Sequence, residues 1–436
     1  MARVLLLATT TGYQTRAFGD AAERLGVELV FATDRCNVLD DPWQDGAIAI
    51  RFHEEAASVE AIVAAARLRP IDGLLVVGDL PTVIAARAAQ ALGLPGHPPD
   101  AAAIAKHKLR TRERLSESGL PVPWFVPIDI DRPSLSSERP WQFPCVVKPV
   151  ALSGSRGVMR ADDQQSLDRA LARLRTLLDA PDVRAERDRT HRTALVEGFI
   201  PGREFAVEGL LHHGALHVLA VFDKPDPLDG PFFEETIYLT PSQAPEGMSG
   251  AIVAAVGAAA RAIGLHHGPV HAECRVNGRG VYVLEVAARP IGGLCARALR
   301  FEPATSDPEG GQRSLEELLL RHALGEPPAG WAREASASGV MMIPIPRRGV
   351  LRGVAGIEDA RAVSCVDEVR ITAKTDQLLV PLPEGASYLG FIFARAGEPG
   401  AVDRALRDAH ARLQFAIDPE FPVLGSETMR YNHAHG

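Results

Sequence analysis

Residues 268–293, GPVHAECRVNGRGVYVLEVAARPIGG, constrain the fold most, because two strand-like runs flank a turn that contains glycine. Successive residues of a strand point to opposite sides, so Glu285 and Arg289 of the second run face the same way. If the two runs pair as a hairpin, Glu273 of the first run can lie beside Glu285. The stretch therefore predicts a sheet face with two carboxylates and an arginine.

The length of the turn decides whether the two glutamates share that face. Pairing Val276 with Tyr282 leaves the three-residue loop 278–280 and puts Glu273 and Glu285 on one side. A two-residue turn shifts the register and separates them. We predict the three-residue loop, because a glycine there adopts a positive φ angle at little cost.

Two carboxylates and an arginine on one face suit a hard divalent cation next to an anion. Mg²⁺ takes oxygen ligands, commonly one or two carboxylates together with substrate phosphates. The alternative is the solvated polar face of an antiparallel sheet, which is common. The hairpin alone leaves both interpretations open.

The composition narrows the class of protein. At 436 residues the chain has length for two to four domains, and its formal charge of −8 without basic blocks argues against nucleic acid as the main partner. The apolar run 4–8 is too short for a signal peptide, and the alanine-rich run 251–260 falls short of a membrane span. Five scattered cysteines form no C-x-x-C pair. We expect a cytoplasmic protein.

Lysine is rare in this chain, since only five of the 47 basic residues are lysine. A lysine that persists against this bias fits places where a compact ammonium is needed, such as a phosphate site. For some of these lysines, the alternative is that they persist by chance. The five are Lys106, Lys108, Lys148, Lys224 and Lys374.

The N-terminal region alternates strand and helix, which predicts a small parallel α/β domain. The expected elements are strands at 3–8, 27–32 and 74–77 and a helix at 17–25. The loop 9–15 has one glycine and poorly matches the dinucleotide motif G-x-G-x-x-G, although Asp34 lies at a suitable distance for a ribose contact. Capping of a helix by the threonines of this loop is the preferred interpretation.

The next region places two lysines on regular elements. Lys108 belongs to a helix predicted at 100–118, and Lys148 to the strand PCVVKPV, which the loop ALSGSRG at 151–157 follows. The small residues of this loop allow a close approach to phosphate, although a mobile hairpin tip is the alternative. The run ALVEGFI at 194–200 then predicts a strand that turns into another.

The remaining features are expected to be structural. His212-His213 forms a hairpin turn, and neither it nor His266-His267 has the spacing of a metal site. From about residue 335 the pattern predicts a separable α+β module, with strands at 339–345, 366–371 and 388–394 and an exposed loop at 374–387.

In chain order, these features are a lysine on a helix, a lysine before a small-residue loop, the run V-E-G-F-I, and Glu…Glu-x-x-x-Arg. This ordered set, over roughly residues 1–330, resembles the ATP-grasp superfamily, whose members form acyl phosphates and pass them to amines or related nucleophiles. The resemblance implies an ATP-grasp fold of the α/β and α+β class. A Rossmann-like domain would precede it and a small α+β module would follow.

The resemblance implies a role for each matching residue. Two lysines look like those that contact ATP phosphates, 153–157 like the phosphate loop, 197–200 like the adenine linker, and Glu204 like the acid that binds the ribose. The implied ATP-binding residues are Lys108, Lys148, Ser153, Gly154, Ser155, Gly157, Glu197, Phe199, Ile200 and Glu204.

The resemblance also implies roles for residues of the hairpin. Glu273 and Glu285 look like ligands of Mg²⁺, with Mn²⁺ as an alternative ion. Arg289 resembles the arginine that steadies the substrate carboxylate and the acyl phosphate, and it is the candidate catalytic residue. His271 shares the face of Glu273 and is a candidate substrate contact and base, or else a packed histidine behind the site.

Two departures refine the family. Ala287 stands where many members place an asparagine as a further metal ligand. The run P-I-G-G after Arg289, with Gly292 and Gly293 as candidate substrate-binding residues, resembles amino-acid ligases and disfavours a biotin carboxylase. F-D-K-P-D-P, E-E-T-I-Y-L-T-P-S and the C-terminal module resemble these ligases too.

We therefore predict an ATP-dependent carboxylate-amine ligase whose small-molecule substrates are amino acids, with no nucleic acid or membrane partner and with a homodimer as one option. Rival hypotheses are another acyl-phosphate ligase of natural-product or nucleotide-precursor synthesis, a non-catalytic nucleotide-binding module, and a nicotinamide oxidoreductase. The expected domains are 1–100 (N-terminal), 101–200 (first ATP-binding subdomain), 201–330 (second subdomain with the Mg²⁺ site) and 331–436 (C-terminal module).

Overall fold

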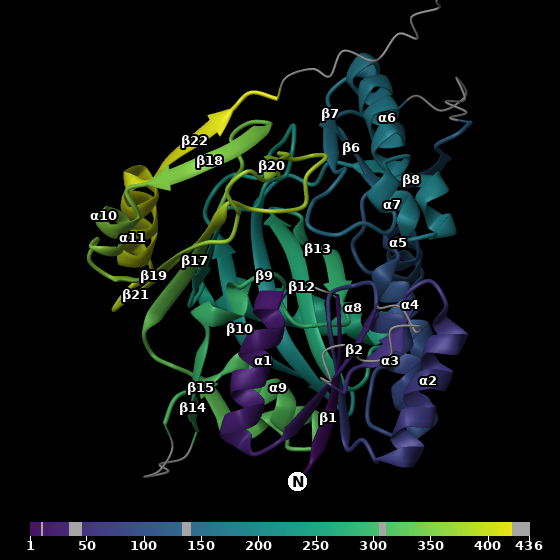
Figure 1. Cartoon of the computed structure of the whole chain (residues 1–436). Coiled ribbons are helices and arrows are strands. Elements are labelled where there is room, and N and C mark those ends of the chain that lie inside the picture. Colours follow the sequence, from purple (N-terminus) through teal and green to yellow (C-terminus); the bar gives the residue numbers. More distant parts are fainter. Residues whose placement is uncertain (10–11, 35–45, 133–140, 305–310, 421–436) are drawn as a thin grey trace, which may run out of the picture.

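The computed structural model describes residues 1–9, 12–34, 46–132, 141–304 and 311–420. In Figure 1 an N-terminal α/β unit lies at the bottom, a small sheet with one long helix lies at the top right, and a larger sheet crosses the middle. The fold is the predicted mixture of α/β and α+β parts.

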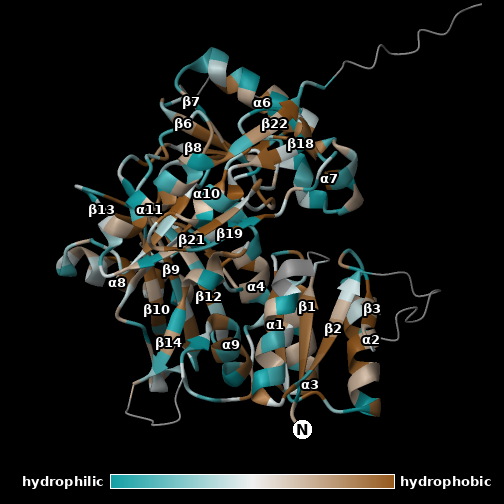
Figure 2. Cartoon of the chain, turned by 60° about the vertical axis from the view of Figure 1, so that its left-hand side comes forward, coloured by the Kyte–Doolittle hydropathy of each residue, from teal (hydrophilic) through white to brown (hydrophobic). Residues whose placement is uncertain are grey.

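The N-terminal unit is a parallel sheet with the strand order β3-β2-β1-β4. Both faces are covered, so β1 is apolar from Val4 to Ala8 instead of alternating, and Figure 2 shows hydrophobic strands between α1 and α2. This confirms the predicted parallel unit. Its elements are β1 (Arg3–Ala8), α1 (Gly12–Leu25), β2 (Glu28–Asp34), β3 (Ile48–Ile50), α2 (Glu55–Leu68), β4 (Gly73–Val77) and α3 (Thr82–Leu92).

The single helix predicted at 100–118 is two helices, α4 (Pro99–Lys106) and α5 (Lys108–Glu117). His107 lies between them with extended backbone, and its ring accepts a hydrogen bond from the N–H of Arg110. This cap satisfies a donor that the first turn of α5 leaves unpaired. The break brings Lys108 to the start of α5.

The second unit, which we call the small sheet, is antiparallel with the order β5-β8-β6-β7. Helix α6 packs leucines against it, and an Asp163–Ser166 capping box fixes where the helix starts. The elements are β5 (Phe125–Asp129), β6 (Cys145–Pro149), β7 (Met159–Ala161), α6 (Gln164–Leu178), α7 (Pro181–Ala185), the 3-10 helix η2 (Arg189–Arg192) and β8 (Thr193–Gly198).

The largest sheet has eight strands in the order β13-β12-β9-β10-β11-β17-β21-β19. Helix α8 packs on one side of it, against β10, β12 and β13. The elements are β9 (Arg203–His212), β10 (Ala215–Lys224), β11 (Ile237–Thr240), α8 (Glu246–Ile263), β12 (Gly268–Asn277), β13 (Gly280–Ala287), β17 (Ala337–Ile343), β19 (Val366–Ile371) and β21 (Gly390–Ala396).

The C-terminal module was predicted to be separable, and here the structure differs. Strand β17 of the module pairs with β11, so the module extends the same hydrogen-bonded sheet. The three strands predicted for the module are present as β17, β19 and β21. The other elements of this half are η3 (Cys295–Ala298), β14 (Arg300–Pro303), β15 (Arg313–Ser314), α9 (Leu315–Ala323), η4 (Pro328–Gly330), β16 (Trp331–Arg333), β18 (Gly349–Ala355), α10 (Ile357–Arg361), β20 (Leu378–Leu379), α11 (Pro399–Arg412) and β22 (Gln414–Asp418).

The β12–β13 hairpin reaches the predicted pairing by a different route. Asn277 pairs with Gly280, so the predicted three-residue loop is wrong and the loop has two residues. The register then shifts at a bulge between Val283 and Glu285, after which Glu273 lies opposite Glu285. The bulge supplies the extra residue that we had placed in the turn, and it restores the shared face.

Helix α8 is long and apolar enough, by length and composition alone, to cross a membrane. Its apolar stripe, which includes Ile252, Val256 and Ile263, is buried in a hydrophobic core cluster with residues of the large sheet. A core helix of a soluble protein passes the same test. The helix is therefore only weak evidence against the expectation that the chain has no membrane partner.

Candidate active site

A cavity with a volume of about 740 Å³ lies where the N-terminal unit, the small sheet and the large sheet meet. We call it the central cavity. All predicted site residues except Gly157 line it: Lys108, Lys148, Ser153, Gly154, Ser155, Glu197, Phe199, Ile200, Glu204, His271, Glu273, Glu285, Arg289, Gly292 and Gly293. Residues almost two hundred positions apart in sequence thus converge on one space.

Gly157 lies outside the cavity lining. Its N–H donates to the carbonyl of Pro383 at 2.8 Å, and an added Cβ would come within 3.0 Å of Leu174 and Leu177. The glycine is needed because its φ is +76° and α6 packs closely there. Its predicted phosphate role finds no support in this placement.

Lys148 is buried beside a carboxylate. Its Nζ lies 2.5 Å from Glu197, which also accepts two hydrogen bonds from Arg112 at 2.8 and 3.2 Å. Burial lowers the pKa of Lys148 to about 8, against the opposing effect of Glu197. Burial alone would raise the pKa of Glu197, but Arg112 and Lys148 lower it to about 2. Glu197 therefore positions the ammonium at the cavity wall.

The lowered pKa of Lys148 predicts that the affinity for ATP depends on pH. Phosphate oxygens favour the charged lysine, so the affinity for ATP should fall as pH rises through about 8, where Lys148 loses its proton. Calorimetric titration of the protein with ATP at several pH values between 6.5 and 9.5 measures this affinity. Lys148→Met should bind ATP more weakly and lack this fall. An identical fall in that variant would assign it to another group.

Lys108 lies between the small-residue loop and the hairpin. Its Nζ donates to the carbonyl of Leu152 at 2.6 Å and lies 3.5 Å from a carboxylate oxygen of Glu285. The lysine thus faces the loop that precedes Ser153 and also the predicted metal ligand. A polyphosphate lying between these two elements would meet a positive charge.

Phe199 lies in an aromatic and cationic patch at the edge of the cavity. The guanidinium carbons of Arg160 and Arg275 lie 4.5 and 5.1 Å from its ring centroid, and the ring of Phe233 stacks at 6.3 Å. Arg275 also donates to the carbonyl of Ile200 at 2.8 Å. These contacts hold the predicted adenine linker in a fixed conformation.

A cluster of carboxylates surrounds Lys224. The scarcity of lysine drew attention to this residue, but no role was predicted for it. Its Nζ lies 2.8 Å from Glu204, 2.6 Å from Glu235 and 3.0 Å from Glu273. The hydroxyl of Tyr238 donates to Glu235 at 2.9 Å. Burial and the neighbouring Glu273 raise the pKa of Glu235 to about 7.

His271 is held as a cation. Its Nδ1 lies 3.0 Å from Glu208, and its Nε2 lies 3.8 Å from Glu273. Burial would lower the pKa of His271, but the two carboxylates raise it to about 9. Glu208 also accepts the N–H of Ile291 in the P-I-G-G run. A protonated imidazole does not suit a general base, and it fits the alternative of a residue that orders the site.

Arg289 is oriented by an acid that sequence analysis did not select. Asp79, which follows β4, accepts hydrogen bonds from Nε at 2.8 Å and Nη2 at 2.9 Å, and Nη1 donates to the carbonyl of Pro290. These bonds leave one N–H on each terminal nitrogen for a substrate anion. The pKa of Arg289 is raised, since Asp79 outweighs the effect of burial.

This pair connects the N-terminal unit to the large sheet, so breaking it should cost stability. Asp79→Ala leaves a buried guanidinium without its partner, and we expect a loss of about 3 kcal/mol in the free energy of unfolding in urea. Glu117→Ala, which removes an exposed ion pair with Arg114, should change it by about 0.5 kcal/mol or less. Equal small losses in both variants would contradict the structural role of Asp79.

The C-terminal module closes the far side of the cavity. The loop predicted at 374–387 contributes Gln377 and Ser387 to the lining, next to Tyr388 and to Phe391 of β21. Its Glu384 pairs with Arg173 of α6. The expectation of an exposed loop holds only in part: Lys374 and Ser387 are exposed, whereas Leu379, Pro383 and Gly385 are buried. The ion pair of Glu384 holds this part of the loop against the small sheet.

The sequence patterns did not single out Asp79, Glu208, Glu235 or the C-terminal aromatic residues that line the cavity. Asp79 had a usable signal, since it follows the carboxyl end of a parallel strand, where α/β folds place their sites. Glu235 lies in the stretch E-E-T-I-Y-L-T-P-S, which resembled the ligases as a whole. Asp34, the ribose contact of the dinucleotide hypothesis, instead pairs with Arg51 at 2.7 Å.

Three family descriptions match the chain in succession: "ATP-grasp N-terminal domain" over residues 19–96, "ATP-grasp domain" over 141–298, and "L-amino acid ligase C-terminal domain 2" over 341–418. The structure of an L-amino acid ligase from Bacillus licheniformis superimposes with a TM-score of 0.79 at 27% identity. The match covers 96% of this chain and 99% of that one. An N5-carboxyaminoimidazole ribonucleotide synthetase from Thermotoga maritima, at 16% identity and a TM-score of 0.66, shares the fold.

Two curated relatives match over part of their length. Carnosine synthase 1 of Gallus gallus is 32% identical over 319 residues, which are 70% of this chain and 33% of that protein. An uncharacterised protein of Sinorhizobium fredii is 24% identical over 345 residues, 75% of this chain and 64% of that protein. The matched part of the chain thus spans a third of the length of the first relative and somewhat under two thirds of the length of the second. With the domain succession and the cavity described above, these matches show that the chain belongs to the ATP-grasp superfamily and resembles its L-amino acid ligases.

Proposed function

We propose that this protein is an ATP-dependent carboxylate-amine ligase that joins two amino acids, or an amino acid and a related amine, through an amide bond. The observation that carries the proposal is the convergence of Lys108, Lys148, Glu273, Glu285 and Arg289 on one cavity. Such a site neutralises charge and positions reactants, which is what phosphoryl transfer needs. The names of the L-amino acid ligase and the carnosine synthase support this reaction type.

The proposed reaction has two steps. A carboxylate oxygen of the first substrate bonds to the γ-phosphorus of ATP, and the bond from that phosphorus to the bridging oxygen breaks, which releases ADP. The amine nitrogen of the second substrate then bonds to the acyl carbon, the bond from that carbon to the phosphate oxygen breaks, and phosphate leaves. The nitrogen gives up a proton. Arg289 would hold the reacting carboxylate through the N–H groups that Asp79 leaves available.

The donor set fits a magnesium ion. Glu273 and Glu285 lie opposite each other beyond the bulge, and both line the cavity. Lys224 and His271 hold the pKa of Glu273 well below its usual range despite burial, so this carboxylate is ionised. Mg²⁺, or Mn²⁺, would supply charge neutralisation at the phosphates when bound. Ala287 offers no ligand atom and lies opposite His271, so protein ligation from this hairpin would come from the two carboxylates.

The wall opposite the carboxylates suits the body of an amino acid. Met342, Tyr388 and Phe391 present apolar surface to the cavity, and Gly292 and Gly293 leave space beside them. Gly293 has a φ of +62° and would bring an added Cβ to 3.4 Å from Phe391, so a side chain there would intrude. An apolar wall next to an arginine favours a carboxylate that carries an uncharged side chain.

A screen of amino-acid pairs tests the proposal. We expect ADP and phosphate in equal amounts only when ATP, a divalent cation, an acid and an amine are all present, with a product whose mass equals the two substrates minus water. Tight ATP binding without turnover on any pair would instead favour the non-catalytic nucleotide-binding module that Ala287 suggests.

A further inference from the structure

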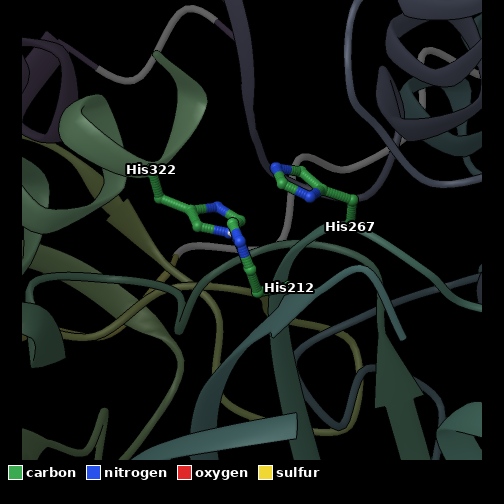
Figure 3. Close-up of side chains that lie close together, drawn as sticks. All are labelled: His212, His267 and His322. Carbon is green, nitrogen blue, oxygen red and sulfur yellow. Dashed lines mark hydrogen bonds between the residues drawn. The ribbon is translucent and has the colours of Figure 1, made fainter. Parts of the chain in front are cut away.

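Three histidines from separate segments converge at the end of the large sheet away from the carboxylates (Figure 3). His212 ends β9, His267 directly precedes β12, and His322 belongs to α9. None of them lines the central cavity. His267 is six residues from Glu273 along the chain, and His212 is six residues from Ala206, the strand partner of Glu273, which corresponds to roughly 20 Å at about 3.3 Å per residue. The cluster therefore plays no part in the proposed reaction.

The ring nitrogens lie near the spacing of metal ligands. Nδ1 of His212 is 3.3 Å from Nε2 of His322, and one nitrogen from each of the three rings lies within 4.8 Å of the others. Imidazole nitrogens that share a tetrahedral zinc ion, each about 2.0 Å from it, lie about 3.3 Å apart. His212 and His322 already meet this spacing, and a nitrogen of His267 would have to approach by at most about 1.5 Å.

The side chain of His267 gives an independent indication that this cluster binds a ligand. It is 4% exposed, and neither of its ring nitrogens has a hydrogen-bond partner among the residues that the structure describes. Its ring stacks on that of His322, with 4.2 Å between centroids. A buried polar atom without a partner costs about 1–3 kcal/mol, and a metal ion that accepts a lone pair would remove this cost.

The surroundings keep the imidazoles in the form that binds metals. His267 and His322 are buried, and burial favours the neutral imidazole, which keeps a lone pair available for a metal ion. His212 is partly exposed, which leaves a side of the cluster open to a water ligand.

We propose that His212, His267 and His322 form a structural site for a first-row transition-metal dication of the Zn²⁺ type, with the fourth position taken by water. Imidazole ligands suit Zn²⁺, Cu²⁺ and Ni²⁺ and do not suit Mg²⁺. The ion would tie β9 and the start of β12 to α9, which in turn packs against β4 of the N-terminal unit. Sequence analysis dismissed both histidine pairs because the third ligand lies on a distant helix.

The test uses the full chain after treatment with a chelator, with Mg²⁺ in excess to occupy carboxylates. Titration with ZnCl₂ should give one equivalent of binding and a raised melting temperature, and Co²⁺ should give visible absorption bands of a tetrahedral site. His322→Asn and the less buried His212→Ala should each weaken Zn²⁺ binding at least about tenfold and remove the cobalt bands. His410→Asn, on α11, should behave as the wild type.

Two results would overturn the site: no stoichiometric binding of Zn²⁺ to the wild type, or binding that neither cluster variant weakens. The first would mean that the rings pack as a metal-free stack. The second would mean that the ion binds other surface histidines. Because ATP and amino acids are absent from these measurements, failure here leaves the ligase proposal untouched, and failure of the ligase screen leaves this site untouched.

Discussion

Glu285→Gln should reduce metal-dependent ADP formation at least about a hundredfold, a barrier increase of about 2.7 kcal/mol. Glutamine keeps the shape of the side chain but removes the charge that would bind the ion. Lys108 would lose the carboxylate that lies 3.5 Å from its Nζ. Since the Glu285 side chain is 27% exposed, the fold should survive the change. The measurement is ADP release with an active amino-acid pair over a range of Mg²⁺ concentrations.

The matched control is Glu113→Gln, a glutamate on the exposed face of α5. It removes the same charge outside the central cavity, so it should retain wild-type turnover. If Glu285→Gln also retained it, the metal role of the β12–β13 hairpin would be wrong. Unchanged urea unfolding of Glu285→Gln would show that its loss of activity is chemical.

Lys148→Arg should lower kcat/KM for ATP about a hundredfold even though the charge is kept. Lys148 is 6% exposed and shares Glu197 with the guanidinium of Arg112. A second, larger guanidinium in this space would displace Arg112 or distort β6, with a cost of about 1–3 kcal/mol in stability. Steady-state kinetics with varied ATP, together with urea unfolding, separates the two effects.

Lys374→Arg is the control for this second change, because Lys374 is exposed in the C-terminal module. It should leave kinetics and stability unchanged. Wild-type kcat/KM in Lys148→Arg would show that a positive charge of any shape suffices, and it would remove the argument from lysine scarcity in this arginine-rich chain.

The β12–β13 hairpin shows how far sequence patterns reach. The predicted pairing of Glu273 with Glu285 is confirmed. A strand offers only two faces, so the register alone decides whether the two glutamates share one. The turn was wrong, since a two-residue loop with a later bulge produces the same register as a three-residue loop. Sequence periodicity constrains which residues share a face, but it does not place an extra residue. Here the bulge lies where Arg112 of α5, distant in sequence, donates to the carbonyls of Val283 and Leu284.

The residues that orient the site were harder to find. Asp79 holds Arg289 across 210 positions, and Arg112 meets Glu197 across 85. No local pattern links such residues, since each pair forms only when separate units pack together. The C-terminal loop is similar: its proline-rich sequence suggested exposure, but the ion pair between Glu384 and Arg173 of α6 holds part of it against the small sheet.

By itself, the sequence determined the class of the fold, the parallel N-terminal unit, the face shared by the two glutamates, and the family, because these depend on local periodicity and on the order of short motifs. Tertiary structure alone decided that Lys224 lies among three carboxylates, that Asp79 aims Arg289, and that three histidines meet at the end of the large sheet. The physical reason is that side chains distant in sequence acquire neighbours, burial and altered pKa values only when the units pack.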